Sequence, residues 1–254
     1  ELNFHISKKM TIFLSLICGI FSKFVPKKVI YCSEKSIKFH EKQHFYDKNK
    51  TVLIYNGCNH KKYFPSKKLR INFRKKHNIK KTQIALGFAG RYAKQKNIPS
   101  LLSAFSKIIK KHKHVYLYMA GKDINSQNKE LTSYSNNLKI EKKVFFLNDQ
   151  KSLLEFYNGI DLLILTSHSE SFPNVIAESM LCSTPVLSSD AGCSKIIINK
   201  CGFILGKNDH QSIFKNLNKI IIFFMNNKSK WRFLKKKSRL QIKKNFSIPS
   251  MANL

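Results

Sequence analysis

The sequence has no cysteine pattern that would hold a metal or build a disulfide framework. Its six cysteines form no C-x-x-C pair, and no histidine lies at ligand spacing from them. Such spacings mark zinc sites, and dense cysteine patterns mark small secreted proteins. We therefore expect reduced thiols in a cytoplasmic protein, without a metal ion. The cysteines are Cys18, Cys32, Cys58, Cys182, Cys193 and Cys201.

A long apolar run is also missing. The most apolar stretch, Met10 to Phe21, is twelve residues long, whereas a transmembrane helix needs about 20 apolar residues. It predicts a buried or interfacial helix, and the lack of a small-residue cleavage site after it disfavours a signal peptide. Flanking lysines would permit peripheral attachment to an anionic membrane. These are Lys8, Lys9, Lys23, Lys27 and Lys28. Because the first residue is Glu1, we also expect a fragment or a processed product.

Acidic residues and arginines are both scarce. Only 14 Asp and Glu residues oppose 47 Lys and Arg, giving a formal net charge of +33. This excess favours phosphorylated ligands, anionic lipid or nucleic acid as partners. However, surfaces that read bases depend on arginine for its planar, bidentate geometry. We therefore expect no specific nucleic-acid partner, although non-specific binding to nucleic acid or to an anionic surface stays open. The five arginines are Arg70, Arg74, Arg91, Arg232 and Arg239.

From Ile84 onward, short apolar strands alternate with helices. This order predicts a doubly wound, parallel α/β sheet covered on both faces, a Rossmann-like domain. Ligands of such domains collect at the carboxyl ends of the strands, where Arg91, Gly121, Glu170 and Ser189 lie. The predicted strands are 84–89, 115–120, 144–147, 162–166, 185–189 and 202–205, and the predicted helices are 98–111, 152–158, 210–225 and one that begins at 174.

The first 55 residues contain too few elements to enclose a core of their own. They comprise the apolar helix, strands at 29–32 and 51–55, and a helix at 33–42. We interpret residues 1–58 as the tail of another domain. A turn at Asn56-Gly57 and the basic stretch 58–68 indicate a linker to the α/β domain. No internal repeat or long low-complexity tract is present.

The stretch from Glu170 to Glu178 joins a buried strand to an amphipathic helix and is the clearest candidate site. Pro173 suits a first helical turn, where its missing N–H is not needed, so the free amides of the next residues point into the loop and attract phosphate. The two carboxylates flank that position and suit hydroxyl groups. A ligand with phosphate between two groups of hydroxyls fits this arrangement, and a nucleotide sugar is such a ligand. The alternative interpretation is a solvated loop residue at Glu170 and a helix-surface charge at Glu178.

Two cations could complete this site. Arg91 follows Gly90 at the end of the first strand of the α/β domain, and Lys96 lies just before the helix that begins near Ile98. Arginine can fork two phosphate oxygens, and lysine adds a compact charge. With the amides after Pro173, they would neutralise a diphosphate and stabilise it as it leaves. In a chain with 47 Lys and Arg residues, a single lysine is more often a solvated surface charge, so Lys96 alone is weak evidence for a phosphate site.

These segments resemble family 4 of the glycosyltransferases, which have the two-domain GT-B fold, and are similar to bacterial enzymes that build O-antigen and other surface polysaccharides. The resemblance covers residues 26–247. It implies that residues 1–58 are the end of an amino-terminal acceptor-side domain, most of which is absent, that 59–226 bind the nucleotide sugar, and that 227–254 cross back toward the first domain. The segments that carry it are Tyr55-Asn56-Gly57, Gly87 to Arg91 with Lys94 to Ile98, Glu170 to Glu178, and Cys182 to Val186.

The resemblance implies a retaining transfer of a sugar from a UDP- or GDP-linked donor to a saccharide or a polyprenyl-linked saccharide, with no cofactor and no obligatory metal. Arg91 and Lys96 would hold the pyrophosphate, Glu170 the hexose, and Glu178 the ribose. The implied catalytic residues are Arg91, Lys96 and Glu170. The implied donor-binding residues are Gly90, Arg91, Lys96, Glu170, Ser171, Phe172, Pro173, Asn174, Val175 and Glu178.

Several positions depart from the family pattern. Ser171 and Asn97 stand where the family often has glycine, and Cys193-Ser194-Lys195-Ile196 lacks a glutamate that many members carry. No general base can be assigned. Three hypotheses follow: a glycosyltransferase at the inner face of the cytoplasmic membrane, a catalytically silent donor-binding fragment, and a basic protein that binds nucleic acid or an anionic surface.

Overall fold

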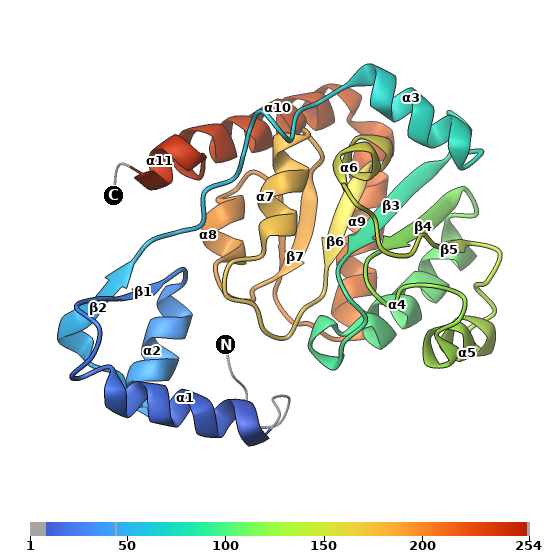
Figure 1. The fold of residues 1–254 in the computed structure, drawn as a ribbon. Helices are drawn as coiled ribbons and strands as arrows, with labels where there is room; N and C mark the ends of the chain where they lie inside the picture. The colour runs from blue at the N-terminus through green and yellow to red at the C-terminus, as the bar shows by residue number, and fades with distance from the viewer. Residues whose placement is uncertain (1–8, 44, 253–254) are drawn as a thin grey trace.

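Six parallel strands form the centre of the molecule, in the spatial order β5-β4-β3-β6-β7-β8 (Figure 1). The computed structural model describes residues 9–43 and 45–252; Lys8 lies outside this part of the chain. The predicted doubly wound parallel sheet is confirmed. Its strands are β3 (Ile84–Ala89), β4 (Val115–Ala120), β5 (Val144–Phe146), β6 (Leu162–Leu165), β7 (Val186–Ser189) and β8 (Phe203–Leu205).

The chain builds the sheet outward from β3 in two directions. It first adds β4 and β5 on one side of β3, and then places β6, β7 and β8 on the other. The strand order therefore reverses between β3 and β6, which pair with each other in parallel. In open α/β sheets the crevice at such a reversal, beyond the carboxyl ends of the strands, is the common ligand site. Arg91 follows β3 and Glu170 follows β6, so the reversal brings the two predicted residues together.

Helices cover both faces of the sheet, and the residues of β3 alternate between the two cores. Ala85 and Ala89 pack into one core with residues of α3, α6, α7, α8 and α10. Leu86 and Phe88 pack into the other with residues of α4, α5 and α9. Successive side chains of a strand point to opposite faces, so this sequence places small side chains on one face of β3 and large ones on the other. The covering helices are α3 (Lys67–Lys76), α4 (Ile98–Lys111), α5 (Lys129–Asn137), α6 (Leu154–Gly159), α7 (Asn174–Leu181), α8 (Ser194–Ile198), α9 (His210–Asn226) and α10 (Lys228–Asn245).

The leading residues form a separate layer at one end of the molecule (Figure 1). They comprise α1 (Lys9–Phe21), β1 (Val29–Tyr31), α2 (Glu34–Gln43), the 3-10 helix η1 (Lys48–Lys50) and β2 (Thr51–Leu53), and β1 pairs with β2 in parallel. Large apolar side chains of α1 are exposed, among them Phe13 at 58% and Phe21 at 55%. In the described part of the chain, no helix combines the length and apolarity that crossing a bilayer requires.

The closing helices return across the α/β unit toward the leading residues. Helix α10 packs against α7, α8 and α9, and the short helix α11 (Ile248–Ala252) follows it. A backbone hydrogen bond from Cys58 N to Phe246 O, 2.7 Å long, ties the chain after β2 to the end of α10. The stretch expected to be a linker therefore lies against α10, and α3 begins within it.

All six cysteines, each within the described residues, are free thiols. Burial raises the pKa of Cys58 and of Cys182 to about 12, and that of Cys193 to about 11. These three thiols are therefore protonated at neutral pH, which makes them poor nucleophiles and poor metal ligands.

Candidate functional site at the carboxyl ends of the strands

A pocket of about 450 Å³ opens beyond the carboxyl ends of β3, β4 and β6. Five of the predicted site residues line it: Gly90, Arg91, Lys96, Glu170 and Val175. Apart from Gly121, which it placed at a strand end, sequence analysis gave no role to the other lining residues, which come from loops and strand ends that are distant in sequence. These are Gln95, Ala120, Gly121, Lys122, Asp149, Gln150 and Leu153.

The loop that carries Arg91 leaves β3 in close contact with the end of β4. Gly90 N donates a hydrogen bond to Ala120 O, and Tyr92 N donates one to Lys122 O, each 2.9 Å long. Gly121 has a φ of +143°, and a Cβ atom there would lie 2.1 Å from Gly90 O. Position 121 therefore requires glycine, both for its backbone conformation and for the close approach of the two loops. The Arg91 side chain is exposed, and within residues 9–43 and 45–252 it makes no ion pair.

Lys96 ends a short 3-10 helix, η2 (Lys94–Lys96), just before α4. Asn97, the next residue, has a left-handed backbone with φ 51° and ψ 40°. Asparagine is enriched in this region among residues other than glycine, so it can stand where the family often has glycine. The carbonyl oxygen of Lys96 accepts a hydrogen bond of 2.9 Å from Thr166 Oγ1, which fixes η2 against the end of β6.

Lys96 and Glu170 form an ion pair at the floor of the pocket. Lys96 Nζ lies 2.5 Å from Glu170 Oε1, and the side chains are 12% and 13% exposed. The same carboxylate oxygen accepts a hydrogen bond of 2.6 Å from Ser167 Oγ. Ser167 is itself buried, and its carbonyl oxygen accepts a hydrogen bond from Ser189 Oγ at the end of β7. The carboxylate of Glu170 is thus held by two neighbours before any ligand is present.

The residues after Glu170 turn away from the pocket. Phe172 and Pro173 are buried, with the Phe172 ring beside those of Tyr55 and Phe246. Asn174 is exposed, and its Oδ1 accepts a hydrogen bond of 3.3 Å from Asn56 Nδ2. Pro173 occupies the N-cap position of α7 rather than its first turn, and the helix begins at Asn174 as predicted. Val175 is the one residue of the 171–175 segment that reaches the pocket lining.

Glu178 lies on the second turn of α7 and is not among the residues that line the pocket. Its Oε2 accepts a hydrogen bond of 2.8 Å from the hydroxyl of Tyr157, a fully buried residue of α6. Burial raises the pKa of Tyr157 well above its usual range, and the charge of Glu178 raises it further. The neutral hydroxyl therefore remains a donor to Glu178 at all physiological pH values.

Helix α2 of the leading segment touches the loops on this side of the α/β unit. Ser36 Oγ lies 3.1 Å from Ser171 Oγ, and Lys35 Nζ lies 2.9 Å from Asp190 Oδ1. The loop that contains Asp190 also packs against the backbone of Glu170 and Ser171. Gly192 has a φ of +56°, and a Cβ atom there would lie 2.3 Å from the carbonyl oxygens of Glu170 and Ser171. The leading segment therefore contacts the neighbours of Glu170 directly.

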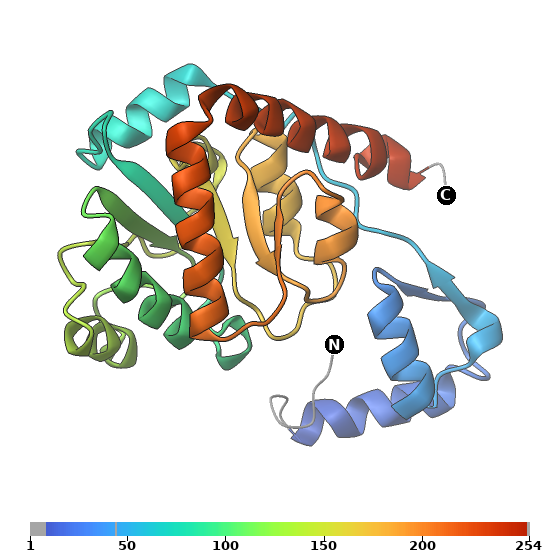
Figure 2. The same ribbon diagram turned by 180° about the vertical axis from the view of Figure 1, so that it is seen from behind.

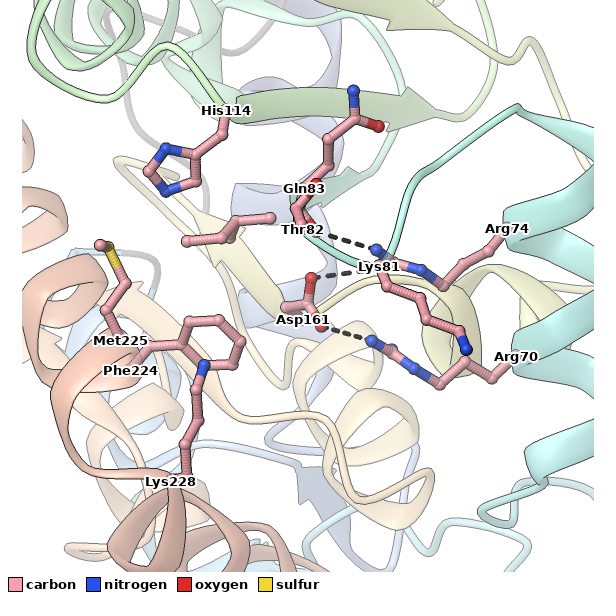
Figure 3. Close-up of a pocket in the computed structure, with 11 residues that line it drawn as sticks. Arg70, Arg74, Lys81, Thr82, Gln83, His114, Asp161, Phe224, Met225 and Lys228 are labelled. Atoms are coloured by element: carbon pink, nitrogen blue, oxygen red, sulfur yellow. Dashed lines mark hydrogen bonds and ion pairs between the residues drawn. The ribbon is translucent and has the colours of Figure 1, made fainter.

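A second group of charges lies at the opposite, amino-terminal edge of the sheet, around Asp161 (Figure 3). Asp161 Oδ1 lies 2.6 Å from Arg70 Nη2, and Asp161 Oδ2 lies 3.3 Å from Arg74 Nη1. Asp161 Oδ2 also accepts a hydrogen bond of 2.8 Å from Ala85 N. Sequence analysis gave these three charged residues no role. The described residues contain no group of three His, Cys, Asp or Glu side chains that could hold a metal ion, at either edge.

Comparison with solved structures defines the class of fold. The HepE protein of Anabaena, solved in complex with UDP and glucose, superposes with a TM-score of 0.84 at 20% identity, over 97% of this chain and 66% of that chain. The carboxyl-terminal domain of the LpcC protein of Francisella tularensis, a group 1 glycosyl transferase, superposes with a TM-score of 0.63 at 19% identity, over 76% of this chain and all of that chain. The fold is the α/β, GT-B type of these glycosyltransferases.

A family model places the chain within this class. The model of the glycosyl transferases group 1 family matches residues 70–241, and the chain belongs to that family. The capsular polysaccharide biosynthesis glycosyltransferase CapM of Staphylococcus aureus is 27% identical over 149 residues, which is 58% of this chain and 39% of CapM. The O-antigen biosynthesis glycosyltransferase WclY of Escherichia coli is 28% identical over 56% of this chain and 38% of WclY. The matched region thus spans about two fifths of the length of either relative.

Proposed function

We propose that this chain binds a nucleotide-diphosphate sugar, linked to UDP or GDP, in the pocket at the carboxyl ends of β3, β4 and β6. The observation that supports the proposal is the convergence of Arg91, Lys96 and Glu170 on one pocket at the reversal of strand order. Arg91 is exposed and has no ion-pair partner among the described residues, so its guanidinium is available to fork phosphate oxygens. HepE, which shares the fold, was solved with UDP and glucose.

Each predicted residue then has a distinct duty. Arg91 and Lys96 neutralise the diphosphate and stabilise it as a leaving group, because fixed charges at that position lower the free energy of the developing negative charge. Glu170 accepts hydrogen bonds from hydroxyls of the hexose. Glu178, held by Tyr157, accepts hydrogen bonds from the ribose; its position outside the pocket lining means that the donor must extend along α7.

We further propose that the complete reaction is a retaining transfer of the sugar to a saccharide or a lipid-linked saccharide, in the synthesis of a bacterial surface polysaccharide. The names of CapM and WclY, which act in capsular polysaccharide and O-antigen biosynthesis, support this substrate class. A lipid-linked acceptor would place the protein at the inner face of the cytoplasmic membrane. Donor binding and sugar transfer are separate measurements, and binding without turnover would identify the chain as a silent donor-binding unit.

Titration calorimetry with UDP and GDP tests the donor site. Arg91→Ala and Lys96→Met should each weaken binding of the preferred nucleotide by about 10- to 100-fold, since each removes a charged hydrogen bond worth about 1.5–3 kcal/mol. Lys94→Met is the matched control, because Lys94 is an exposed lysine of the same 3-10 helix that does not line the pocket. Its affinity should stay within about twofold of the wild type.

Two outcomes of the titration would contradict the proposed donor site. If neither nucleotide nor its sugar-linked form binds, or if Lys94→Met and Lys96→Met lose affinity equally, the pocket is not the donor site. Binding of DNA at the same protein concentration, with no response to nucleotides, would favour the basic nucleic-acid-binding alternative.

A further inference from the structure

Helices α3 and α10 hold an unusual concentration of positive charge. Together they carry 15 of the 47 Lys and Arg residues of the chain in 28 positions, and neither contains an Asp or Glu. Both helices lie along the same edge of the molecule in Figures 1 and 2. Burial lowers the pKa of Lys235 on α10, and the charge of Arg70 on α3 lowers it further. We call this surface the α3–α10 face. It lies at the amino-terminal edge of the sheet, away from the donor pocket.

Most cations of the α3–α10 face have no acidic partner. In the described part of the chain, the ion pairs formed by the two helices are those of Arg70 and Arg74 with Asp161. Figure 3 shows both arginines turned toward Asp161, so they brace α3 against the sheet. The exposed lysines of the two helices are therefore left for an external anion. They are Lys67, Lys68, Lys75, Lys76, Lys228, Lys230, Lys236, Lys237, Lys243 and Lys244.

The outward side of α10 also carries large apolar side chains. Trp231, Ser238 and Ile242 are buried against the α/β unit. On the opposite side, Phe233 is 68% exposed and Leu240 is 64% exposed. They lie seven residues apart, or two helical turns, with exposed Lys236 and Lys237 between them at helical spacing and Lys243 and Lys244 on the next turn. On α3, Ile71 is 65% exposed.

We propose that the α3–α10 face is the surface through which this protein docks on an anionic lipid bilayer. This inference deepens the peripheral location proposed above and rests on it. Because the face and the donor pocket lie at opposite edges of the sheet, a lipid-linked acceptor must extend its saccharide away from the bilayer to reach the pocket. Phe233 and Leu240 enter the boundary between headgroups and acyl chains, while the lysines around them contact lipid phosphates. A polynucleotide would also bind the lysines through its phosphates. It would not bury the exposed side chains of Phe233 and Leu240.

The charged residues around α1 offer a different surface, and the structure separates the two. In both ribbon views α1 lies at the end of the molecule opposite α3 and α10 (Figure 2). One flat bilayer therefore cannot contact both helices at once. The α3–α10 face has the higher density of charge, because α1 itself contains one lysine, Lys9, among its 13 residues.

Vesicle flotation with the full chain tests the proposal. The probe is a set of vesicles of phosphatidylcholine alone or with about a third of phosphatidylglycerol. Replacing Lys236, Lys237, Lys243 and Lys244 with glutamine should weaken binding to the anionic vesicles by at least 100-fold, since each cation near such a surface contributes about fivefold. The matched control replaces four exposed lysines at the carboxyl-terminal edge of the sheet and should change binding by less than about threefold. They are Lys94, Lys129, Lys151 and Lys207, which follow β3, β4, β5 and β8 and do not line the donor pocket.

A second variant separates a bilayer from a soluble polyanion. Phe233→Ser with Leu240→Ser should weaken vesicle binding by about tenfold and leave RNA binding unchanged, because both side chains contact lipid only when they insert. The proposal is overturned if the four-lysine variant binds vesicles like the wild type, or if the serine variant does, in which case the face is a site for soluble polyanions. UDP binding, measured on the same variants, reports the donor site independently.

Discussion

Each of the two edges of the sheet carries a cluster of two cations and one carboxylate, but the ion pairs within the two clusters differ. At the carboxyl-terminal edge, Arg91, Lys96 and Glu170 line an open pocket, and the exposed arginine has no ion-pair partner among the described residues. At the amino-terminal edge, Arg70 and Arg74 both contact the carboxylate of Asp161, which is 7% exposed.

The difference lies in how many donors remain for a ligand. Arg70 Nη1 lies 3.1–3.2 Å from the carbonyl oxygens of Asn158, Gly159 and Ile160. Arg74 Nη2 donates to the carbonyl oxygens of Lys80 and Gln83, each at 2.8 Å. Most N–H groups of these two arginines therefore donate within the protein, and they hold α3 on the sheet. Two cations beside one carboxylate can therefore form either a structural brace or a binding site. Which of the two they form depends on how many of their N–H donors are not already bonded within the protein.

Removing the carboxylate at the amino-terminal edge should have the largest effect on stability. Asp161→Asn leaves the Arg74 guanidinium, whose side chain is 11% exposed, without its counter-charge. Burial already lowers the pKa of Arg74, and the charge of Asp161 opposes that shift. We expect a loss of about 3–5 kcal/mol in the free energy of unfolding. Urea unfolding followed by the fluorescence of Trp231, the single tryptophan and a buried residue, measures it.

Asp149→Asn provides the control for that experiment, because Asp149 is an exposed carboxylate near the other edge. It should change the free energy of unfolding by less than about 0.5 kcal/mol. A loss below about 1 kcal/mol in Asp161→Asn would show that the arginines do not depend on Asp161, and the contrast between the two edges would disappear.

Removing the carboxylate at the carboxyl-terminal edge should change ligand choice more than stability. Glu170→Gln releases Lys96 from its ion pair, so the affinity for UDP should stay within about threefold of the wild type. The affinity for a UDP-linked hexose should fall about tenfold, because the charged acceptor for its hydroxyls is lost. Calorimetric titration with both ligands separates the effects. Equal losses for UDP and the sugar nucleotide would contradict the assignment of Glu170 to the hexose.

The smallest effect is expected at the contact between the leading segment and the α/β unit. Lys35 and Asp190 form an exposed ion pair, with side chains 46% and 43% exposed. Such pairs contribute about 0–1 kcal/mol, so Lys35→Ala should lower the free energy of unfolding by less than about 1 kcal/mol. Urea unfolding at low and high salt measures this, since salt should erase most of the difference. A loss comparable to that of Asp161→Asn would mean that the two segments unfold as one unit through this contact.

Sequence analysis predicted the strands well because each is an apolar run bounded by turns. It also placed Arg91 and Glu170 correctly beyond the carboxyl ends of strands, while their role in binding stays a prediction. It missed α3, in which six of ten residues are Lys or Arg and the single buried residue is Phe73. It also missed α5, whose buried positions are Leu131 and Ser135. Helices with so narrow an apolar side leave little periodic signal in a single sequence.

The residues that support the candidate site could not be predicted in the same way. Ser167 contacts Glu170 across a short loop, and Lys122 and Asp149 reach the pocket from the loops after β4 and β5. These contacts depend on which strands are neighbours and on the path of each loop, which composition and periodicity do not encode. The duty of Glu178 stays a prediction, since its carboxylate contacts Tyr157 and lies outside the pocket lining.

The crossing of two loops at Gly121 has a consequence for how this site would tolerate mutation. No group of Gly121 is proposed to touch the donor, yet any side chain there collides with the backbone that presents Arg91. In a random mutant library selected for donor binding, position 121 should therefore be as intolerant as the charged residues themselves, although its substitutions remove no ligand contact. The positions of the inactive variants would therefore identify the residues that hold the backbone of the pocket as well as the residues that contact the donor.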